Sequence, residues 1–157
     1  MKNANCKLLL RVWQLAYLPS GEPTRQPVGL VTDAWFQVGV SIDGEGAGDL
    51  HGRSVSLSSD GNRVAIGAPS NDGGGEDSGN VRVFEYDSSS WTQLGADIDG
   101  LAAGEHSGLV ISLSSDGRRV AIGSPGREGV NVSSSSHVRV YKYGSYSWFQ
   151  LGADISG

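Results

Sequence analysis

The chain has 157 residues, a net charge of −5 at pH 7 and 18% charged residues, which is a length typical of one domain. The acidic balance argues against a nucleic-acid partner, because binding to a phosphate backbone needs clustered Lys and Arg. The single cysteine, Cys6, excludes an intrachain disulfide, and the longest apolar runs are too short to predict a transmembrane helix.

Residues 1–34 do not match the repeat that fills the rest of the chain. Lys2, Lys7 and the three leucines after it are similar to the start of a signal peptide, but Arg11 interrupts the apolar run. Leu10–Tyr17 has the alternation of a strand. We interpret residues 1–34 as a non-repeat segment, in which Leu10–Tyr17 is the candidate for a remnant strand of a preceding unit.

Residues 35–157 contain a sequence that recurs every 56 or 57 residues. Trp35, Trp91 and Trp148 each begin a Trp-x-Gln-(Val/Leu)-Gly motif, and SVSLSSDGNRVAIGAP at 54–69 is nearly repeated as VISLSSDGRRVAIGSP at 110–125. A period of this length indicates a supersecondary unit copied in tandem. One such unit cannot bury its apolar surface alone, so we expect the neighbouring copy to cover it.

The first half of each repeat predicts a β-hairpin. Its strands are expected at 54–58 and 63–68, and again at 110–114 and 119–124, joined by Ser-Ser-Asp-Gly, a turn sequence that tolerates positive φ. The second strand of each hairpin is nearly all apolar and alternates small with branched residues. This pattern is typical of a strand buried on both faces, in which glycine lets another layer approach.

The second half of each repeat predicts two more strands. Val81 and Val83 point to one face and Arg82 and Phe84 to the other, and the second repeat preserves this alternation from 138 to 143. A fourth strand is expected to begin at each repeat's tryptophan, with Leu94, Ala96 and Ile98 sharing one face in the first repeat. Because the tryptophans recur at equivalent positions, we interpret them as packing residues between repeats and not as a ligand platform.

Four antiparallel strands at this spacing predict an all-β fold, made of antiparallel four-stranded blades of an incomplete β-propeller. A β-solenoid is the alternative, although its coils are usually shorter. We expect an orphan outer strand at 35–44, blade one at 45–100 and blade two at 101–157. This is about two and a half blades, whereas propellers close with roughly four to eight. We therefore expect that copies of the chain assemble into a ring or, as slightly favoured, that it is one part of a longer array.

The motif Val64–Pro69, together with the Trp-x-Gln-Leu-Gly and Leu-Ser-Ser-Asp-Gly sequences, resembles a divergent FG-GAP-like repeat over residues 35–157. FG-GAP repeats are the blade units of integrin α-subunit propellers, and the resemblance implies an extracellular or cell-surface protein. The Phe-Gly half of the motif is replaced by His51-Gly52 and Ser107-Gly108. The calcium loop of the integrin type is shortened to Ser-Ser-Asp-Gly with one carboxylate, whereas calcium takes about six to eight oxygens, so that site is not carried over.

The richest group of oxygen ligands lies in the glycine-rich loop of the first repeat. Asp72, Glu76 and Asp77 are candidate ligands of a calcium ion there, and no other cofactor is expected. The alternative is a solvated loop with no metal. It is supported by the second repeat, where the corresponding Gly126–Asn131 loses most of the carboxylates.

The connections between repeats carry carboxylates beside histidines, a combination that occurs in general bases and metal sites. Because this pattern recurs, we interpret it as turn formation and hydrogen bonding between repeats. His137 has no recognisable partner in the sequence. The residues concerned are Asp43, Glu45, Asp49, His51, Asp99, Glu105 and His106.

The sequence contains no nucleophile motif such as Gly-x-Ser-x-Gly, so we do not expect an enzyme. The leading hypothesis is a non-catalytic binding or scaffold module, whose partners are a protein, a glycan, or further propeller blades in the same or another chain. The alternative is a partial propeller from a secreted enzyme whose catalytic part lies elsewhere.

Overall fold

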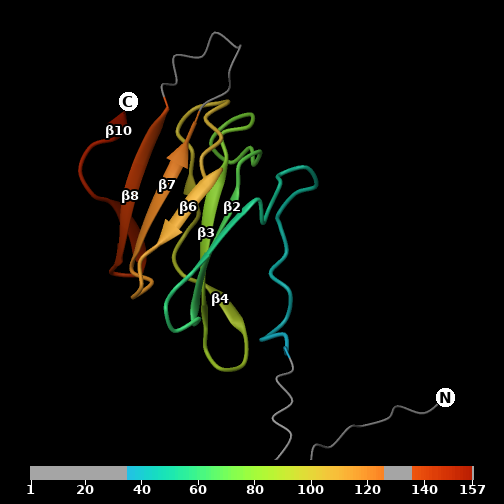
Figure 1. Ribbon diagram of the computed structural model, residues 1–157. Coiled ribbons are helices and arrows are strands. Elements are labelled where there is room, and N and C mark those ends of the chain that lie inside the picture. Colours follow the sequence, from blue (N-terminus) through green and yellow to red (C-terminus); the bar gives the residue numbers. More distant parts are fainter. Residues whose placement is uncertain (1–34, 126–135, 157) are drawn as a thin grey trace, which may run out of the picture. The chain divides into compact units, whose positions relative to one another are not determined.

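The computed structural model describes residues 35–125 and 136–156 (Figure 1). These residues form strands and turns without any helix, so they include no helix that could span a membrane. The described residues from Gln37 onwards belong to one compact unit. The candidate remnant strand at Leu10–Tyr17 lies outside the described residues.

Each repeat forms its own antiparallel sheet, and this confirms the all-β prediction. Sheet A comprises β1 (Ser54–Leu57), β2 (Arg63–Ala68), β3 (Asn80–Tyr86), β4 (Trp91–Gln93) and β5 (Ile98–Asp99), and sheet B comprises β6 (Val110–Leu113), β7 (Arg119–Ser124), β8 (His137–Gly144), β9 (Ser147–Gln150) and β10 (Ile155–Ser156). In sheet A, the strands β1 to β4 are neighbours in chain order, and β5 also pairs with β3. In sheet B, the order runs from β6 through β7 to β8, which pairs with both β9 and β10. The arrangement is consistent with partial propeller blades.

The hairpin turns form as the sequence predicts. Gly61 has a φ of 71°, and the Asp60 carboxylate accepts hydrogen bonds from the Ser58 hydroxyl at 2.6 Å and the Asn62 amide at 3.0 Å. Asp116 repeats this arrangement, with its acceptor oxygen 2.5 Å from the Ser114 hydroxyl. Because these bonds favour the ionised carboxylate, they lower the pKa of both aspartates.

The expected fourth strand is divided into two short strands in each repeat. Gly95 lies between β4 and β5 with a φ of 81°, a left-handed conformation that breaks the ladder. The Leu94 amide bonds the Val83 carbonyl at 2.7 Å and the Leu94 side chain packs against the core, whereas Ala96 is exposed. Ala96 therefore does not share the buried face of Leu94 and Ile98.

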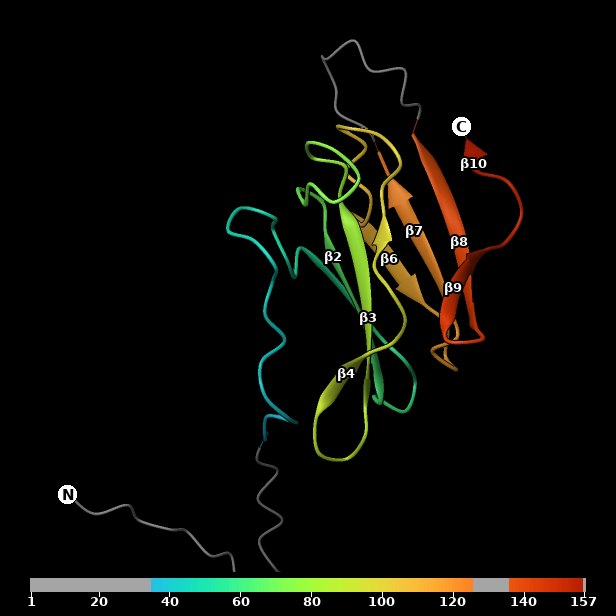
Figure 2. The ribbon, with the colours of Figure 1, turned by 180° about the vertical axis from the view of Figure 1, so that it is seen from behind.

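The two sheets lie side by side and share one apolar core (Figures 1 and 2). Sheet A contributes Val81 and Val83 from one face of β3, as the alternation predicts, and sheet B contributes the opposing face of β6 and β7. The seven buried residues of this core are Ala65, Val81, Val83, Ile98, Leu113, Val120 and Ile122. Each repeat thus buries the apolar face of the other.

The other face of sheet A is covered by residues that precede it in the chain. Val64, Ile66 and Phe84 form a second small core, against which Ile42 packs. Residues 35–44, expected as an orphan outer strand, form no strand in the described structure. A strand needs a neighbouring strand to complete its hydrogen bonds, and Ile42 is held here by side-chain packing instead.

Candidate functional site

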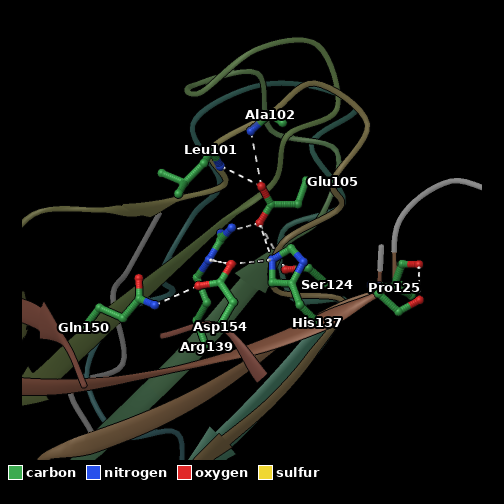
Figure 3. Close-up of polar contacts among 10 residues, drawn as sticks. Leu101, Ala102, Glu105, Ser124, Pro125, His137, Arg139, Gln150 and Asp154 are labelled. Carbon is green, nitrogen blue, oxygen red and sulfur yellow. Dashed lines mark hydrogen bonds and ion pairs between the residues drawn. The ribbon is translucent and has the colours of Figure 1, made fainter. Parts of the chain in front are cut away.

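A buried ionic cluster lies at one end of sheet B (Figure 3). Glu105, from the loop before β6, is 1% exposed. Its Oε1 accepts hydrogen bonds from the Arg139 guanidinium at 2.5 Å and the Ser124 hydroxyl at 3.2 Å, and lies 3.1 Å from Nε2 of His137. His137 and Arg139 reach it from alternate positions on the same face of β8.

The second oxygen of Glu105 shapes its own loop. Its Oε2 accepts hydrogen bonds from the backbone amides of Leu101 at 2.7 Å and Ala102 at 3.2 Å. Both carboxylate oxygens are therefore engaged, one with side chains of sheet B and one with the incoming loop. A carboxylate held in this way fixes the loop on the sheet.

Asp154 completes the cluster from the segment between β9 and β10. It accepts hydrogen bonds from Gln150 at 2.8 Å and from Nε of Arg139 at 3.0 Å, and these bonds lower the pKa of Asp154. Burial disfavours the charged form of Arg139, but the charges of Glu105 and Asp154 outweigh burial and raise the Arg139 pKa. The charged groups of this cluster thus pair with one another and form a structural network.

The first repeat places a looser version of this cluster at the same end of sheet A. Arg82, the counterpart of Arg139, donates to the Asp43 carbonyl at 2.8 Å and lies 3.7 Å from the Glu45 carboxylate. Its guanidinium is also 3.3 Å from Nδ1 of His51. Glu45 is half-exposed, so Arg82 has no equivalent of the buried carboxylate that binds Arg139.

Several polar atoms of this looser cluster are incompletely satisfied. Among the described residues, Nε2 of His51, Oδ1 of Asn80 and Nε of Arg82 are buried without a hydrogen-bond partner. Burial, followed by the charge of Arg82, lowers the pKa of His51. Burial, followed by the charges of Asp97 and Glu45, raises the pKa of Asp99. The polar cluster around Arg82 in the first repeat is therefore less completely hydrogen-bonded than the cluster around Arg139 in the second.

The predicted calcium ligands lie in the loop between β2 and β3, which is tied to the frame by its backbone. Asp72 accepts a hydrogen bond from the Asp77 amide at 2.8 Å, while the carbonyls of Glu76 and Asp77 accept from the Gly104 and His106 amides at 2.8 and 3.1 Å. In the described part of the chain, no three acidic, histidine or cysteine side chains gather in a way that could hold a metal. Calcium binding by Asp72, Glu76 and Asp77 stays a prediction, which titration of the chain with CaCl₂ tests.

The connections between repeats do form turns and hydrogen bonds, as interpreted from the sequence. Asp49 accepts from the Asn71 side chain at 2.8 Å, and Nδ1 of His106 lies 3.0 Å from the Pro69 carbonyl of the preceding repeat. His51 and His106 do not occupy equivalent positions, however, because the repeat aligns Gly52 with Gly108 and therefore His51 with Ser107. His51 contacts Arg82 instead of a carbonyl of a neighbouring repeat. The recurrence that the sequence suggested for the histidines is therefore only approximate.

Sequence reasoning missed the cluster of Glu105, His137 and Arg139 and left His137 without a partner. The signal was the alternation of polar residues at the start of β8, where His137 and Arg139 face the same way. Identifying Glu105 as their partner required the placement of a loop more than 30 residues away in the chain.

The tryptophans form contacts between consecutive repeats. The indole of Trp91 donates to the Val38 carbonyl at 2.9 Å, and that of Trp148 donates to the Leu94 carbonyl at 2.7 Å. Each indole also packs on a tyrosine of its own sheet, Tyr86 or Tyr143, with ring centroids 5.2 Å apart. Trp91 and Trp148 thus act as packing residues.

Comparison with known proteins supports the repeat assignment. A family model described as the FG-GAP repeat matches residues 35–84, a span from the first recurring tryptophan to the third strand of sheet A. A search of curated proteins gives no match. One period later, residues 91–141 preserve the tryptophan, the Leu-Ser-Ser-Asp-Gly turn and the apolar strand. Residues 35–84 of this chain thus match an FG-GAP-like repeat, and the related sequence that follows forms a second sheet of the same topology.

Proposed function

We propose that the chain is a non-catalytic binding or scaffold module, in which FG-GAP repeats of propeller type present loops to a protein or glycan. The observation that carries this proposal is the contrast between a repeated frame and a loop that differs. The contacts of the hairpin turns and tryptophans recur in both repeats, whereas the sequence of the Asn71–Gly79 loop differs from that of the corresponding residues 126–136 in the second repeat. Variable loops on a rigid frame are the usual carriers of recognition.

The structure of this loop suits recognition. Both ends are anchored, because the Asn71 amide bonds the Ala68 carbonyl at 3.1 Å and the Gly79 amide bonds the Asn71 carbonyl at 2.8 Å. Between these anchors, Asp72 and Glu76 are exposed. The ordered ends reduce the entropy lost on binding, and the two carboxylates favour a partner with hydrogen-bond donors or positive charge.

The buried charges support a non-catalytic role. The Glu105 oxygens are both occupied by donors of the chain, and Arg139 is held between Glu105 and Asp154. A general acid or base must reach a proton of the substrate, and a 1% exposed carboxylate engaged on both oxygens is poorly placed to do so. We also propose an extracellular or cell-surface location, because FG-GAP repeats are typical of extracellular proteins.

Binding is tested by probing the full chain on a glycan array and against a displayed peptide library. We expect a defined subset of ligands, with affinity reduced about tenfold by the double variant Asp72→Ala and Glu76→Ala. Thr92→Ala is the control, because Thr92 is exposed on β4, outside the loop. Absence of selective binding in both formats would contradict the proposal. Turnover of chromogenic glycosides or esters by the purified chain would also contradict the proposal, because the proposed module is non-catalytic.

A further inference from the structure

The interface between sheets A and B shows what an apolar face of this repeat accepts. At Gly67 in β2, an added Cβ would lie 2.1 Å from the Gly108 carbonyl oxygen, so only glycine permits this approach. At Gly95, an added Cβ would lie 3.1 Å from the Trp148 ring. In the first repeat, Gly67 thus lies against the loop before β6 and Gly95 lies against the tryptophan of the second repeat.

The free face of sheet B has the same features, but nothing in the described structure uses them. At Gly123, the counterpart of Gly67, an added Cβ would meet only ordinary contacts with Val110 at 3.5 Å. At Gly152, the counterpart of Gly95, no described atom lies within 4 Å. Gly123 has no positive φ that would require glycine, so its own sheet gives no reason for a glycine there.

Apolar side chains surround Gly123 on this face and line a shallow groove with it. Val138 and Ile155 are 37% and 62% exposed, whereas their counterparts in sheet A, Val81 and Ile98, are buried in the core between the sheets. The groove therefore consists of residues equivalent to those on the inner face of sheet A, which sheet B covers.

The surface that would fit this groove is also present on the chain. In the core between the sheets, Leu113 of sheet B packs against sheet A, and its counterpart Leu57 on the outer face of sheet A is 58% exposed. Gly52, the counterpart of Gly108, has no described atom within 4 Å of an added Cβ. The outer face of sheet A is thus of the type that sheet B presents to sheet A. It is exposed at Leu57, whereas Ile42 covers its small core.

We propose that the free face of sheet B binds a second copy of this chain through the outer face of its sheet A. The second copy must first release its own residues 37–43. Ile42, Ile98 and Ile155 are equivalent positions in successive repeats, and Ile42 already packs on the outer core of sheet A, where Ile155 of the first copy would lie. Residues 37–43 therefore act as a cap that competes with association.

Trp91 would change its hydrogen-bond partner when residues 37–43 are released and a second copy binds. Its indole bonds the Val38 carbonyl within the cap at 2.9 Å and packs against Gly39. In the assembled form the same indole would bond the Leu151 carbonyl of the first copy and cover its Gly152. This association uses the strand faces and not the Asn71–Gly79 loop, so it stands or fails separately from the proposed ligand binding.

A mixed cysteine experiment tests the docking geometry. Between the sheets, the Leu113 amide donates to the Ser56 hydroxyl at 2.9 Å; between two copies, the equivalent pair is Leu57 and Ser112. In a background of Cys6→Ser, we prepare Leu57→Cys and Ser112→Cys as separate full-length chains. We expect a disulfide-linked dimer when the two are mixed under mild oxidation, and only trace dimer when either is oxidised alone.

Each other outcome of this experiment counts against the proposal. Equal cross-linking by Ser112→Cys alone would indicate two sheet B faces in contact, which overturns the head-to-tail arrangement. Absence of a linked dimer in the mixture, at concentrations where light scattering shows association, would indicate a different contact. A wild-type chain that stays monomeric at all accessible concentrations would overturn the proposal altogether.

Single substitutions then separate assembly from folding. Gly123→Ala should leave the monomer folded, because its Cβ meets only ordinary contacts, yet it places a methyl group against Gly52 of the second copy. We expect the association constant to fall about tenfold or more. Ile155→Asp should also lower the association constant, while the same change at Leu101, which is exposed in a loop away from the groove, should have no effect. Conversely, Ile42→Ser should strengthen association by loosening the cap. Unchanged association in Gly123→Ala and Ile155→Asp would refute the docking face.

Discussion

The indole of Trp148 in sheet B donates a hydrogen bond to the carbonyl oxygen of Leu94, which belongs to the preceding repeat, over 2.7 Å. Trp91 makes the same bond to Val38. The two contacts link each sheet to the Trp-x-Gln-(Val/Leu)-Gly segment that precedes it in the chain. The positive φ of Gly39 and Gly95 turns the chain beneath the indole, which packs on the glycine. One tryptophan per repeat therefore fixes the spacing between successive units.

Replacing Trp148 by Phe tests the contribution of this bond. Phenylalanine retains an aromatic ring against Tyr143 but removes the indole donor, leaving the Leu94 carbonyl without it. We expect the free energy of unfolding to fall by about 1 kcal/mol from the lost hydrogen bond, with further loss from the smaller ring. Urea unfolding followed by circular dichroism measures the change. Tyr146→Phe is the control, because Tyr146 is 89% exposed, and an equal loss in both variants would contradict the assigned role.

The buried pairing of Glu105 with Arg139 predicts a second effect on stability. Glu105→Gln removes the charge that compensates the buried guanidinium. Breaking a buried ion pair in this way costs about 3 kcal/mol or more, although Asp154 keeps part of the compensation. Chemical unfolding of the full chain measures the loss.

Glu45→Gln provides the matched comparison in the first repeat. Glu45 is half-exposed and 3.7 Å from Arg82, so solvent screens the pair and we expect a loss of only about 0–1 kcal/mol. Similar losses in the two variants would show that the Glu105 cluster does not stabilise the fold as its burial indicates.

Local patterns predicted most of the fold, because the features that define it are short-range. The Asp60-Gly61 turn, the apolar run in β2 and the alternation of Val81 and Val83 each depend on a few adjacent residues. The division of the fourth strand was less predictable. Gly95 breaks it with a positive φ, whereas the alternation of Leu94, Ala96 and Ile98 favoured a continuous strand.

The polar clusters could not be predicted in the same way, because they depend on loops placed by tertiary packing. Arg82 and Arg139 occupy equivalent positions, yet one contacts a half-exposed Glu45 and the other a buried Glu105. The difference arises from the incoming loops, which diverge in sequence. The bond from Trp148 was equally hidden, because its acceptor is a backbone carbonyl 54 residues away.

The glycine of β2 predicts a steric effect that its counterpart in β7 should not show. Gly67→Ala places a methyl group 2.1 Å from the Gly108 carbonyl oxygen, so the two sheets must separate locally. Overpacking of this kind costs about 1–3 kcal/mol. In Gly123→Ala the added methyl group meets only ordinary contacts with Val110 at 3.5 Å and lowers the entropy of the unfolded chain, so we expect a gain of up to about 1 kcal/mol. Thermal unfolding at low protein concentration compares them, and equal stability of the two variants would contradict the close approach at Gly67.

The turn between β3 and β4 predicts a dependence of stability on acid pH. The side-chain hydroxyl of Ser89 and the amides of Ser90 and Ser89 bond the Asp87 carboxylate, and they lower its pKa to about 2. The folded chain therefore binds this proton less readily than the unfolded chain, so the ionised turn stabilises the fold above the usual aspartate pKa of about 3.8. That stabilisation is lost as the pH falls from about 4 towards 2. We expect Asp87→Asn to flatten this part of the stability profile, while Asp72→Asn, which leaves the turn between β3 and β4 intact, should retain the loss of stability towards pH 2. Urea unfolding between pH 5 and 2, with a carboxyl titration by NMR, gives both curves, and an Asp87 titration midpoint near 4 in the folded chain would refute the assignment.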